Sequence, residues 1–222
     1  MMTIRLVAED VWQVYGVPAH AINAYIAGEA LIDAMTRWAQ RVVMEAVRRH
    51  PVTSVALTHC HPDHQGMADR VCRSLGIPLA CHQQDVAWME GTAPVTFRSR
   101  AVTRFQYAFA GPTRRVDRVL RDGDMIGDFR VIHAPGHTPG SVIYFRDSDR
   151  LAIAGDIVSN LNPYSRRVRL AEPPAGYSTD PEENRRSLRA LIQLNPSLVC
   201  LGHGPPLRDP RKLEEFALQL GI

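Results

Sequence analysis

The chain has 222 residues, of which 45% are hydrophobic and 22% charged, and its formal net charge is +3. This composition is that of an ordinary globular protein and excludes disordered, collagen-like and low-complexity classes. A charge so close to neutral demands neither a nucleic-acid nor a membrane partner. We expect residues 1–222 to form one domain, since layered α/β domains of roughly 200 to 250 residues are common.

The first part of the chain predicts a small antiparallel sheet. Short β-rich runs cover residues 11–14, 23–27 and 30–32, and the last two are separated by a two-residue connection. The first 16 residues include acidic side chains where a signal peptide needs an apolar run, and no segment reaches the ~18 apolar residues of a membrane helix. We therefore expect a cytoplasmic location, with no membrane partner and with the cysteines as reduced thiols.

The middle of the chain alternates helix and strand patterns. In order, the apolar spacing predicts a helix over 36–49, a strand over 54–58, a helix through 71–75 that closes at Gly76, a strand over 78–81 and a short helix over 85–90. Residues 91–112 are poorly periodic and predict a mobile loop or an irregular helix.

Regular patterns return from residue 119 onward. They predict strands over 129–133, 141–145 and 151–154, a helix over 181–194 and a strand over 198–201. Strands followed by helices occur twice along the chain. This order predicts an α/β (α+β) fold with two sheets covered by helices, rather than a barrel.

Basic residues are concentrated in one stretch, between residues 98 and 121. They are Arg98, Arg100, Arg104, Arg114, Arg115, Arg118 and Arg121. Such a stretch can attract an anionic substrate, but charge clusters of this density usually just face water.

Three histidines and an aspartate lie within six residues, directly after the strand predicted over 54–58. They are His59, His61, Asp63 and His64. An extended backbone would point the first three to one side, and His64 would join them as a helix begins. Neutral imidazole and carboxylate are the ligands expected of catalytic zinc. One loop can therefore supply ligands to two adjacent cations.

Three later polar residues share one setting, just past a predicted strand and next to glycine. They are His137, Asp156 and His203. Glycine has no Cβ, so it permits tight turns and a close approach of the backbone to a bound ion. Each alone is weak evidence, but together with the histidine-rich loop they complete a coordination set.

The loop from His59 to His64 resembles the His-x-His-x-Asp-His signature of the metallo-β-lactamase superfamily, and the three later residues follow in that family's order. The similarity extends from Asn23 to His203. It implies a four-layer αββα sandwich with the metals at one edge, between the two sheets. The ligand assignment that it implies is His59, His61 and His137 for one metal ion, Asp63, His64 and His203 for the other, and Asp156 as the bridge.

A metal-dependent hydrolase is the activity that this resemblance implies. Two zinc ions about 3.5 to 4 Å apart can share a water and lower its pKa toward 7, so that hydroxide attacks a carbonyl group. Iron or manganese are the alternative metals. Asp63, a ligand close to that water, is the candidate catalytic residue that orients it and shuttles its proton. We expect a small-molecule substrate with an ester, thioester or lactone-type bond, and no nucleic acid.

Several alternatives stay open. A β-lactam substrate is less favoured, because true β-lactamases of the superfamily generally have cysteine or serine at the place of Asp156. The set is more similar to the thioesterase and lactonase branches such as glyoxalase II, although Met67 stands where a second glycine is common and the chain is too short for the helical extension of glyoxalase II. A mononuclear iron enzyme similar to persulfide dioxygenases would use His59, His137 and Asp156. A phosphodiesterase or nuclease would use the arginines as a phosphate guide.

Other residues near the ligands have two interpretations. Four candidates for fixing ligand orientation, or for ordinary turn and cap hydrogen bonds, are Asp33, Thr58, Thr138 and Ser141. Tyr164 and Tyr177 can line a substrate pocket or act as packing anchors. The histidines without a ligand-like setting, which we expect to pack or face solvent, are His20, His50, His82 and His133.

Overall fold

The computed structural model describes residues 3–16, 18–95, 97, 103, 107–162 and 164–222. Their strands form two sheets. In the first sheet the strands follow chain order: β1 (Thr3–Ala8), β2 (Val11–Tyr15), β3 (Asn23–Ala27), β4 (Ala30–Ile32), β5 (Ser54–Ala56), β6 (Leu79–His82) and β7 (Arg118–Leu120). In the second the order is β12 (Leu198–Cys200), β11 (Leu151–Ile153), β10 (Val142–Arg146), β9 (Phe129–His133) and β8 (Met125–Ile126).

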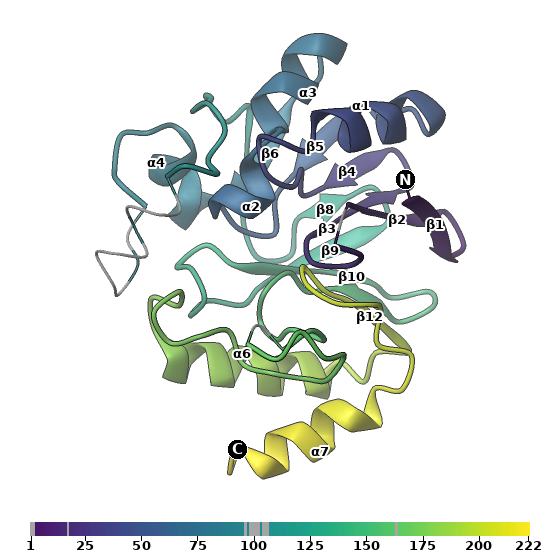
Figure 1. The fold of residues 1–222 in the computed structure, drawn as a ribbon, viewed down its shortest axis with the longest axis vertical. Coiled ribbons are helices and arrows are strands. Elements are labelled where there is room, and N and C mark those ends of the chain that lie inside the picture. The colour runs from purple at the N-terminus through teal and green to yellow at the C-terminus, as the bar shows by residue number, and fades with distance from the viewer. Residues whose placement is uncertain (1–2, 17, 96, 98–102, 104–106, 163) are drawn as a thin grey trace.

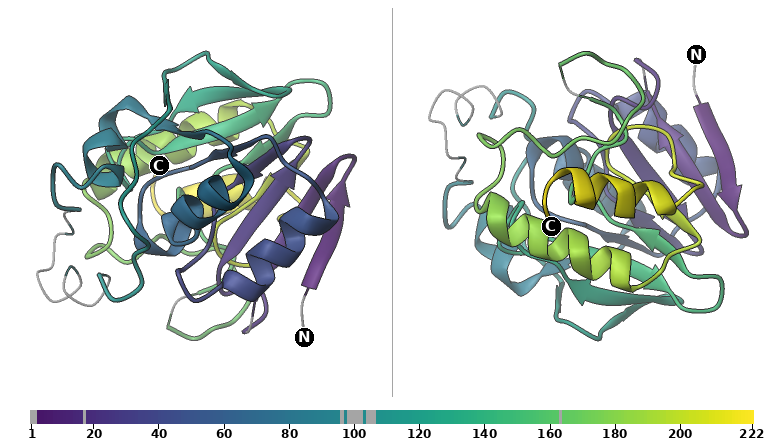
Figure 2. Two further views of the ribbon diagram at one scale, coloured as in Figure 1. Left: turned by 90° about the horizontal axis from the view of Figure 1, so that it is seen from above. Right: turned by 90° about the horizontal axis from the view of Figure 1, so that it is seen from below.

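Helices cover the outer face of each sheet, which gives the four-layer αββα sandwich (Figure 1). The helices on the first sheet are α1 (Gln40–Arg49) and α3 (Ala68–Leu75), and those on the second are α6 (Pro181–Gln193) and α7 (Arg211–Gln219). Seen from below, α6 and α7 lie side by side (Figure 2). The shorter helices are α2 (Pro62–Gln65), the 3-10 turn η1 (Gln83–Asp85) and α4 (Val86–Met89).

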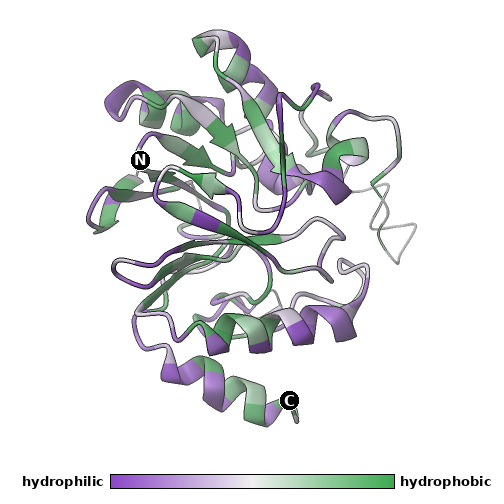
Figure 3. Ribbon diagram, turned by 180° about the vertical axis from the view of Figure 1, so that it is seen from behind, coloured by the Kyte–Doolittle hydropathy of each residue, from purple (hydrophilic) through white to green (hydrophobic). Residues whose placement is uncertain are grey.

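Three apolar clusters hold these layers together. The central one lies between the two sheets and includes Tyr25, Leu120 and Tyr144, all fully buried. The outer clusters pack α1 and α3, or α6 and α7, against the sheets. Figure 3 shows hydrophobic residues concentrated on the central strands, while the helices carry both hydrophobic and hydrophilic residues. Removing this apolar surface from water is the main force that holds the sandwich together.

Two helix boundaries follow from the local sequence. The helix α3 ends at Gly76, whose φ of +67° is easy for glycine and costly for residues with a Cβ. The helix α6 begins after Asp180, whose carboxylate accepts the backbone N–H groups of Glu182 and Glu183, and Pro181 fills the first turn. Both helices therefore lie where the sequence predicted them.

Some elements differ from the sequence-based expectation. The strands β1, β7 and β8 and the helix α7 were not predicted. The helix predicted over 36–49 begins only at Gln40, and the strand predicted over 54–58 ends at Ala56. The predicted loop over 91–112 lies partly outside the described residues. In the described part of the chain, no helix is long and apolar enough to cross a membrane.

The strand directions decide where polar residues gather. The strands β4, β5, β6 and β7 are parallel, as are β11 and β12. Parallel strands present their carboxyl ends at the same edge of a sheet, where α/β folds place their ligands. Asp33 follows β4, His59 follows β5, Asp85 follows β6, Asp156 follows β11 and His203 follows β12.

Candidate metal centre

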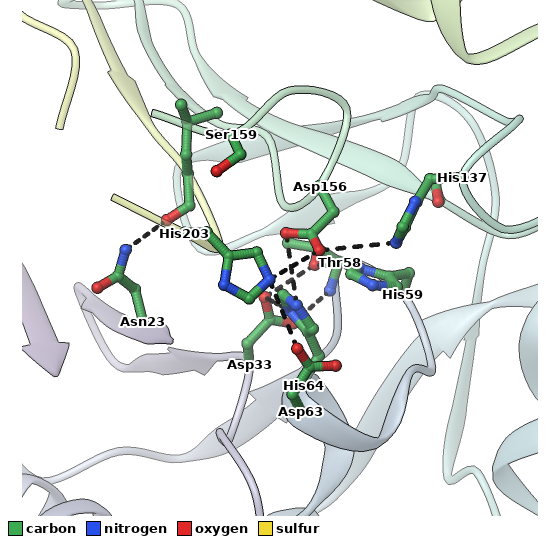
Figure 4. Close-up of polar contacts among 12 residues, drawn as sticks. Asn23, Asp33, Thr58, His59, Asp63, His64, His137, Asp156, Ser159 and His203 are labelled. Atoms are coloured by element: carbon green, nitrogen blue, oxygen red, sulfur yellow. Dashed lines mark hydrogen bonds and ion pairs between the residues drawn. The ribbon is translucent and has the colours of Figure 1, made fainter. Parts of the chain in front are cut away.

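The seven candidate ligands converge at this edge, and Figure 4 labels all of them except His61. They form three overlapping groups, within each of which one ligand atom per residue lies within 4.8 Å of the others. The groups are His59, His61 and His137; His59, His64 and Asp156; and Asp63, His64 and His203. The first and third are the two triads that the resemblance implied, so the structure brings together every residue of the predicted set.

The carboxylate of Asp156 lies between the two triads, with His137 on one side and His203 on the other in Figure 4. Its Oδ2 is 3.0 Å from Nε2 of His203 and 3.6 Å from Nε2 of His137, and its Oδ1 is 3.5 Å from Nε2 of His64. One carboxylate thus faces ligands of both triads, which is the position that a bridging group needs.

The histidine-rich loop folds differently from a continuous extended segment. The backbone is extended at His61, with φ −75° and ψ 154°, and then Pro62 begins the helix α2. Asp63 therefore lies in the first helical turn and not on the extended face with His59 and His61. The change in direction lets a short segment face both triads.

Hydrogen bonds at Nδ1 orient two of the imidazole rings in the loop. The Nδ1–H of His64 donates to Oδ2 of Asp33 over 2.9 Å, and that of His59 donates to the Thr58 hydroxyl over 3.1 Å. Thr58 in turn donates to Asp33 through both its hydroxyl and its backbone N–H. Each contact fixes the tautomer and turns Nε2 toward the centre. The geometry confirms the orienting interpretation of Asp33 and Thr58.

The other two histidines have partners that the sequence did not indicate. The Nδ1 of His137 lies 3.1 Å from the hydroxyl of Ser178, 41 residues along the chain, and Nδ1 of His203 donates to the carbonyl of Ala21. The amide of Asn23 donates to the carbonyls of Leu201 and Gly204, both over 2.8 Å, and so holds the loop around His203. These contacts join residues distant in sequence, so no local pattern predicts them.

A buried carboxylate, Asp85, connects two ligand loops. Its Oδ2 accepts the Cys60 N–H over 2.9 Å and the Thr138 hydroxyl over 2.8 Å, and its Oδ1 accepts the Gly140 N–H over 2.8 Å. Thr138 and Ser141 also contact each other, at 2.9 Å. The side chains of Thr138 and Ser141 thus hydrogen-bond within their own loop and to Asp85. Among the described residues, neither hydroxyl forms a hydrogen bond with a candidate ligand ring. Asp85 follows β6 at the same edge, and that position was the available signal for it.

Unpartnered polar atoms show that the centre suits a cation. Within the described residues, Nε2 of His59, His61, His64 and His137 and Oδ1 of Asp156 are buried without a hydrogen-bond partner. Buried polar atoms are rarely left so, because each costs free energy unless a partner satisfies it. Four imidazole nitrogens and a carboxylate oxygen that converge in this way fit divalent metal ions with nitrogen and oxygen ligands.

The histidines divide into two electrostatic classes. Burial lowers the pKa of His59 and His61 well below its usual value and that of His137 to about 4, and neighbouring imidazoles act in the same direction. These three rings are therefore neutral at pH 7, which is the form that binds a metal.

The rings of His64 and His203 behave in the opposite way. Burial alone would lower both pKa values, but the carboxylates around them dominate. Asp156, Asp33 and Asp63 raise the pKa of His64 well above its usual value, and Asp156 and Asp63 raise that of His203 to about 9. Burial would raise the pKa of Asp156, but the imidazoles of His203 and His64 hold it well below its usual range.

A pocket of about 350 Å³ opens onto the centre. Its floor includes His61, Asp63 and Asp156, and its walls include both Tyr164 and Tyr177. Tyr164 is 82% exposed, so it lines the rim and does not anchor the fold. The ring of Tyr177 lies edge-on to that of Phe97, with 6.0 Å between centroids. The size is suited to a small molecule.

The arginine-rich stretch is only partly described. Arg98, Arg100 and Arg104 lie outside the described residues. Arg114 contacts Asp117 at 3.3 Å and Asp69 at 3.6 Å, and Arg118 donates to the carbonyl of Met125. Among the described residues, the arginine that lines the pocket is Arg166, from another part of the sequence.

The remaining histidines belong to none of the three ligand groups and make ring contacts with other side chains. His82 and His133 stack on each other with 4.1 Å between centroids, and tilted ring pairs join His50 to Trp12 and His20 to Tyr15. These are packing contacts.

Comparison with known families agrees with this geometry. A family model described as the metallo-beta-lactamase superfamily matches residues 17–203, which include all seven candidate ligands. The chain belongs to the metallo-beta-lactamase superfamily. The protein "Probable metallo-hydrolase YflN" of Bacillus subtilis (strain 168) is 28% identical to it over 201 residues, covering 80% of this chain and 75% of YflN.

The chain is also similar to one protein described with bound iron and to one described as a thioesterase. A crystal structure of TTHA1623 in a di-iron-bound form is 26% identical, with a TM-score of 0.65, and the match covers 88% of this chain and 93% of that one. The Homo sapiens "Acyl-coenzyme A thioesterase MBLAC2" is 27% identical over 181 residues, which cover 73% of this chain and 61% of MBLAC2.

Proposed function

We propose that the protein is a hydrolase with two zinc ions that cleaves an ester, thioester or lactone-type carbonyl bond. The observation that carries the proposal is the convergence of two ligand triads on either side of the Asp156 carboxylate, at the floor of an open pocket. When bound, the ions would supply an activated water and polarise the carbonyl of the substrate. The thioester class has the further support of the similarity to MBLAC2.

The protein's own residues have separate roles in this proposal. The residues proposed to hold one ion are His59, His61 and His137, those proposed to hold the other are Asp63, His64 and His203, and Asp156 contributes to both. Asp33, Thr58 and Ser178 keep the imidazole Nε2 atoms aimed inward. Asp63 is the proposed catalytic residue, because its carboxylate is both at the centre and on the pocket floor, where it can accept and release a proton.

The proposal also covers the native metal and the location of the protein in the cell. The similarity to a di-iron protein supports iron as the alternative metal for the same side chains. We propose that the chain acts as a single domain, in the cytoplasm, on a small molecule. The pocket volume of about 350 Å³ supports a small-molecule substrate.

The test is metal analysis of the purified protein together with a substrate panel. We expect two equivalents of zinc per chain, and hydrolysis of thioesters, esters or lactones above that of β-lactams and phosphodiesters. Glutathione persulfide, with oxygen consumption as the readout, is the arm for an iron oxygenase. Asp63→Asn removes the proton acceptor but retains the side-chain volume, so we expect a loss of about 100-fold or more in kcat.

Three outcomes would contradict the proposal. One is iron-dependent oxygen consumption without hydrolysis, and another is a protein that takes up no metal. The third concerns Asp63 alone: if Asp63→Asn retained its metals and its full rate, the catalytic role of Asp63 would be wrong. Asp147→Asn, a change in an exposed carboxylate that pairs with Arg130, is the control and is expected to keep full activity.

A further inference from the structure

Among the described residues, the buried carboxylate of Asp85 makes no hydrogen bond to a candidate metal ligand, yet it joins the two loops that carry five of them, including His59, His61 and His137. Asp85 has an exposed fraction of 0%. The loop of His59 and His61 reaches it through the N–H of Cys60, which lies between those two residues. The loop of His137 reaches it through the next residue, Thr138, and through Gly140. The two loops are separated by more than 70 residues in sequence.

The contact is too close for either loop to shift freely. Gly140 packs so tightly on Asp85 that a Cβ added there would lie 2.6 Å from the carboxyl carbon. Both carboxylate oxygens are used, one by Gly140 and the other by Cys60 and Thr138. All three partners donate, so the group must accept on both sides. An amide of the same shape offers one acceptor and turns an NH₂ group toward an N–H donor.

We propose that Asp85 is a positioning residue that sets the metal affinity of the three-histidine triad, made of His59, His61 and His137. The inference rests on the proposed metal-binding function. Metal sites tolerate only a few tenths of an ångström in ligand position. Because each ligand of this triad is next in sequence to a residue that Asp85 holds, a change at Asp85 moves the two loops relative to each other. The other triad has its own supports, Asp33 and Asn23.

The experiment compares metal binding by Asp85→Asn, Thr138→Val and Thr138→Ser in the full chain. Zinc affinity is measured by competition with a chromophoric chelator, and cobalt(II) absorption reports the geometry of each triad. We expect Asp85→Asn to weaken one zinc equivalent by about 10- to 100-fold and to change the absorption of one cobalt equivalent. Thr138→Val should weaken the same equivalent roughly fivefold, the effect of one lost hydrogen bond, and Thr138→Ser should restore it.

A control separates positioning from general destabilisation. Asp117 is a second carboxylate beside β6, where it accepts the Leu79 N–H over 2.9 Å, but it contacts neither ligand loop. Asp117→Asn should lower the melting temperature and leave both zinc affinities unchanged. Should Asp85→Asn fail to fold, the pair Thr138→Val and Thr138→Ser decides the question.

The inference is overturned if Thr138→Val and any folded Asp85→Asn bind both zinc equivalents within twofold of the unchanged protein, with the same cobalt spectrum. It is also overturned if Asp117→Asn weakens zinc as much as Thr138→Val does. If the protein without substitutions binds two metal ions but hydrolyses none of the substrates, the proposed function is contradicted, whereas the proposed role of Asp85 is not. An unchanged protein that binds no metal contradicts both.

Discussion

The two triads differ in how far they are prepared for a metal. His59, His61 and His137 are at most 3% exposed, and burial and like neighbours lower their pKa values, so the rings are neutral at pH 7. The side chains of Asp63 and His203 are 20% and 23% exposed, and the carboxylates nearby raise the pKa of His203 to about 9. The three-histidine triad is thus buried and uncharged. In the second triad Asp63 and His203 are partly exposed, whereas His64 is buried, and the raised pKa values of both its histidines favour their protonated forms. We call this second set the open triad.

This difference assigns different tasks to the triads. A neutral, buried cluster has no proton to release, so it can bind a cation with little change. The open triad must release protons when it binds a cation, and its members Asp63 and His203 line the pocket. Under the proposed function, the first triad would hold its ion without releasing a proton, and the second would provide the proton transfer that hydrolysis needs. Asp156 faces ligands of both triads, so a substitution of Asp156 is the strongest test of whether the two triads form one centre.

The largest effect should come from Asp156→Ala. Since this carboxylate faces both triads, its loss should prevent stable binding at both, whereas His203→Ala should remove one metal equivalent only. We expect a fall in activity of about 1,000-fold or more, because a metal centre supplies several kcal/mol of the barrier reduction. Elemental analysis and steady-state kinetics are the measurements. If Asp156→Ala retained one full equivalent, the two triads would be independent sites and the bridging role would fail.

The second effect is a difference in pH dependence between the two zinc equivalents. The pKa of His203 is about 9, so this ring is protonated at lower pH in the metal-free protein, and the pKa of His64 is raised as well. Zinc must therefore displace protons from this triad. Affinity at the open triad should therefore rise with pH between 6 and 8, by about tenfold per unit for each proton released. At the three-histidine triad the lowered pKa values leave the rings neutral throughout, so affinity should be flat.

Calorimetry in buffers of different ionisation enthalpy measures these protons directly. We expect one equivalent that releases at least one proton at pH 7 and one that releases none from histidine. Equal proton release by the two equivalents would remove the electrostatic distinction between the triads.

Local sequence patterns predicted the candidate ligands, and the family resemblance implied their division into triads and the order of the layers, but neither predicted the difference in charge between the triads. Histidines beside a buried strand and glycine-flanked polar residues are local patterns, and strand direction brings them to one edge. The pKa contrast depends instead on which carboxylates face which ring, as Asp33 faces His64 across 31 residues of sequence. Ser178, Asp85 and Asn23 are ordinary polar residues in sequence, and only folding places them against the ligand loops.

Missed elements have a similar explanation. The strand β1 pairs with β2 at the edge of its sheet, with a register shift between Leu6 and Ala8, so its alternation is interrupted. The helix α7 covers only part of the apolar cluster beside β12, with Leu213 and Ala217 as its buried residues. Short or half-covered elements carry too few apolar positions for their period to be recognised.

The smallest effect should be that of Ser178→Ala, which tests the buried three-histidine triad through the orientation of His137. The hydroxyl fixes Nδ1 of His137 over 3.1 Å, and its loss frees the ring without altering charge. We expect the three-histidine equivalent to weaken by roughly fivefold, while the pH-dependent equivalent keeps its affinity. Ser197→Ala is the matched control, since that hydroxyl donates to the carbonyl of Asp149 at the opposite end of β12. If Ser178→Ala instead weakened the pH-dependent equivalent, that equivalent would be the one bound by the three-histidine triad, and the assignment argued from burial and charge would be wrong.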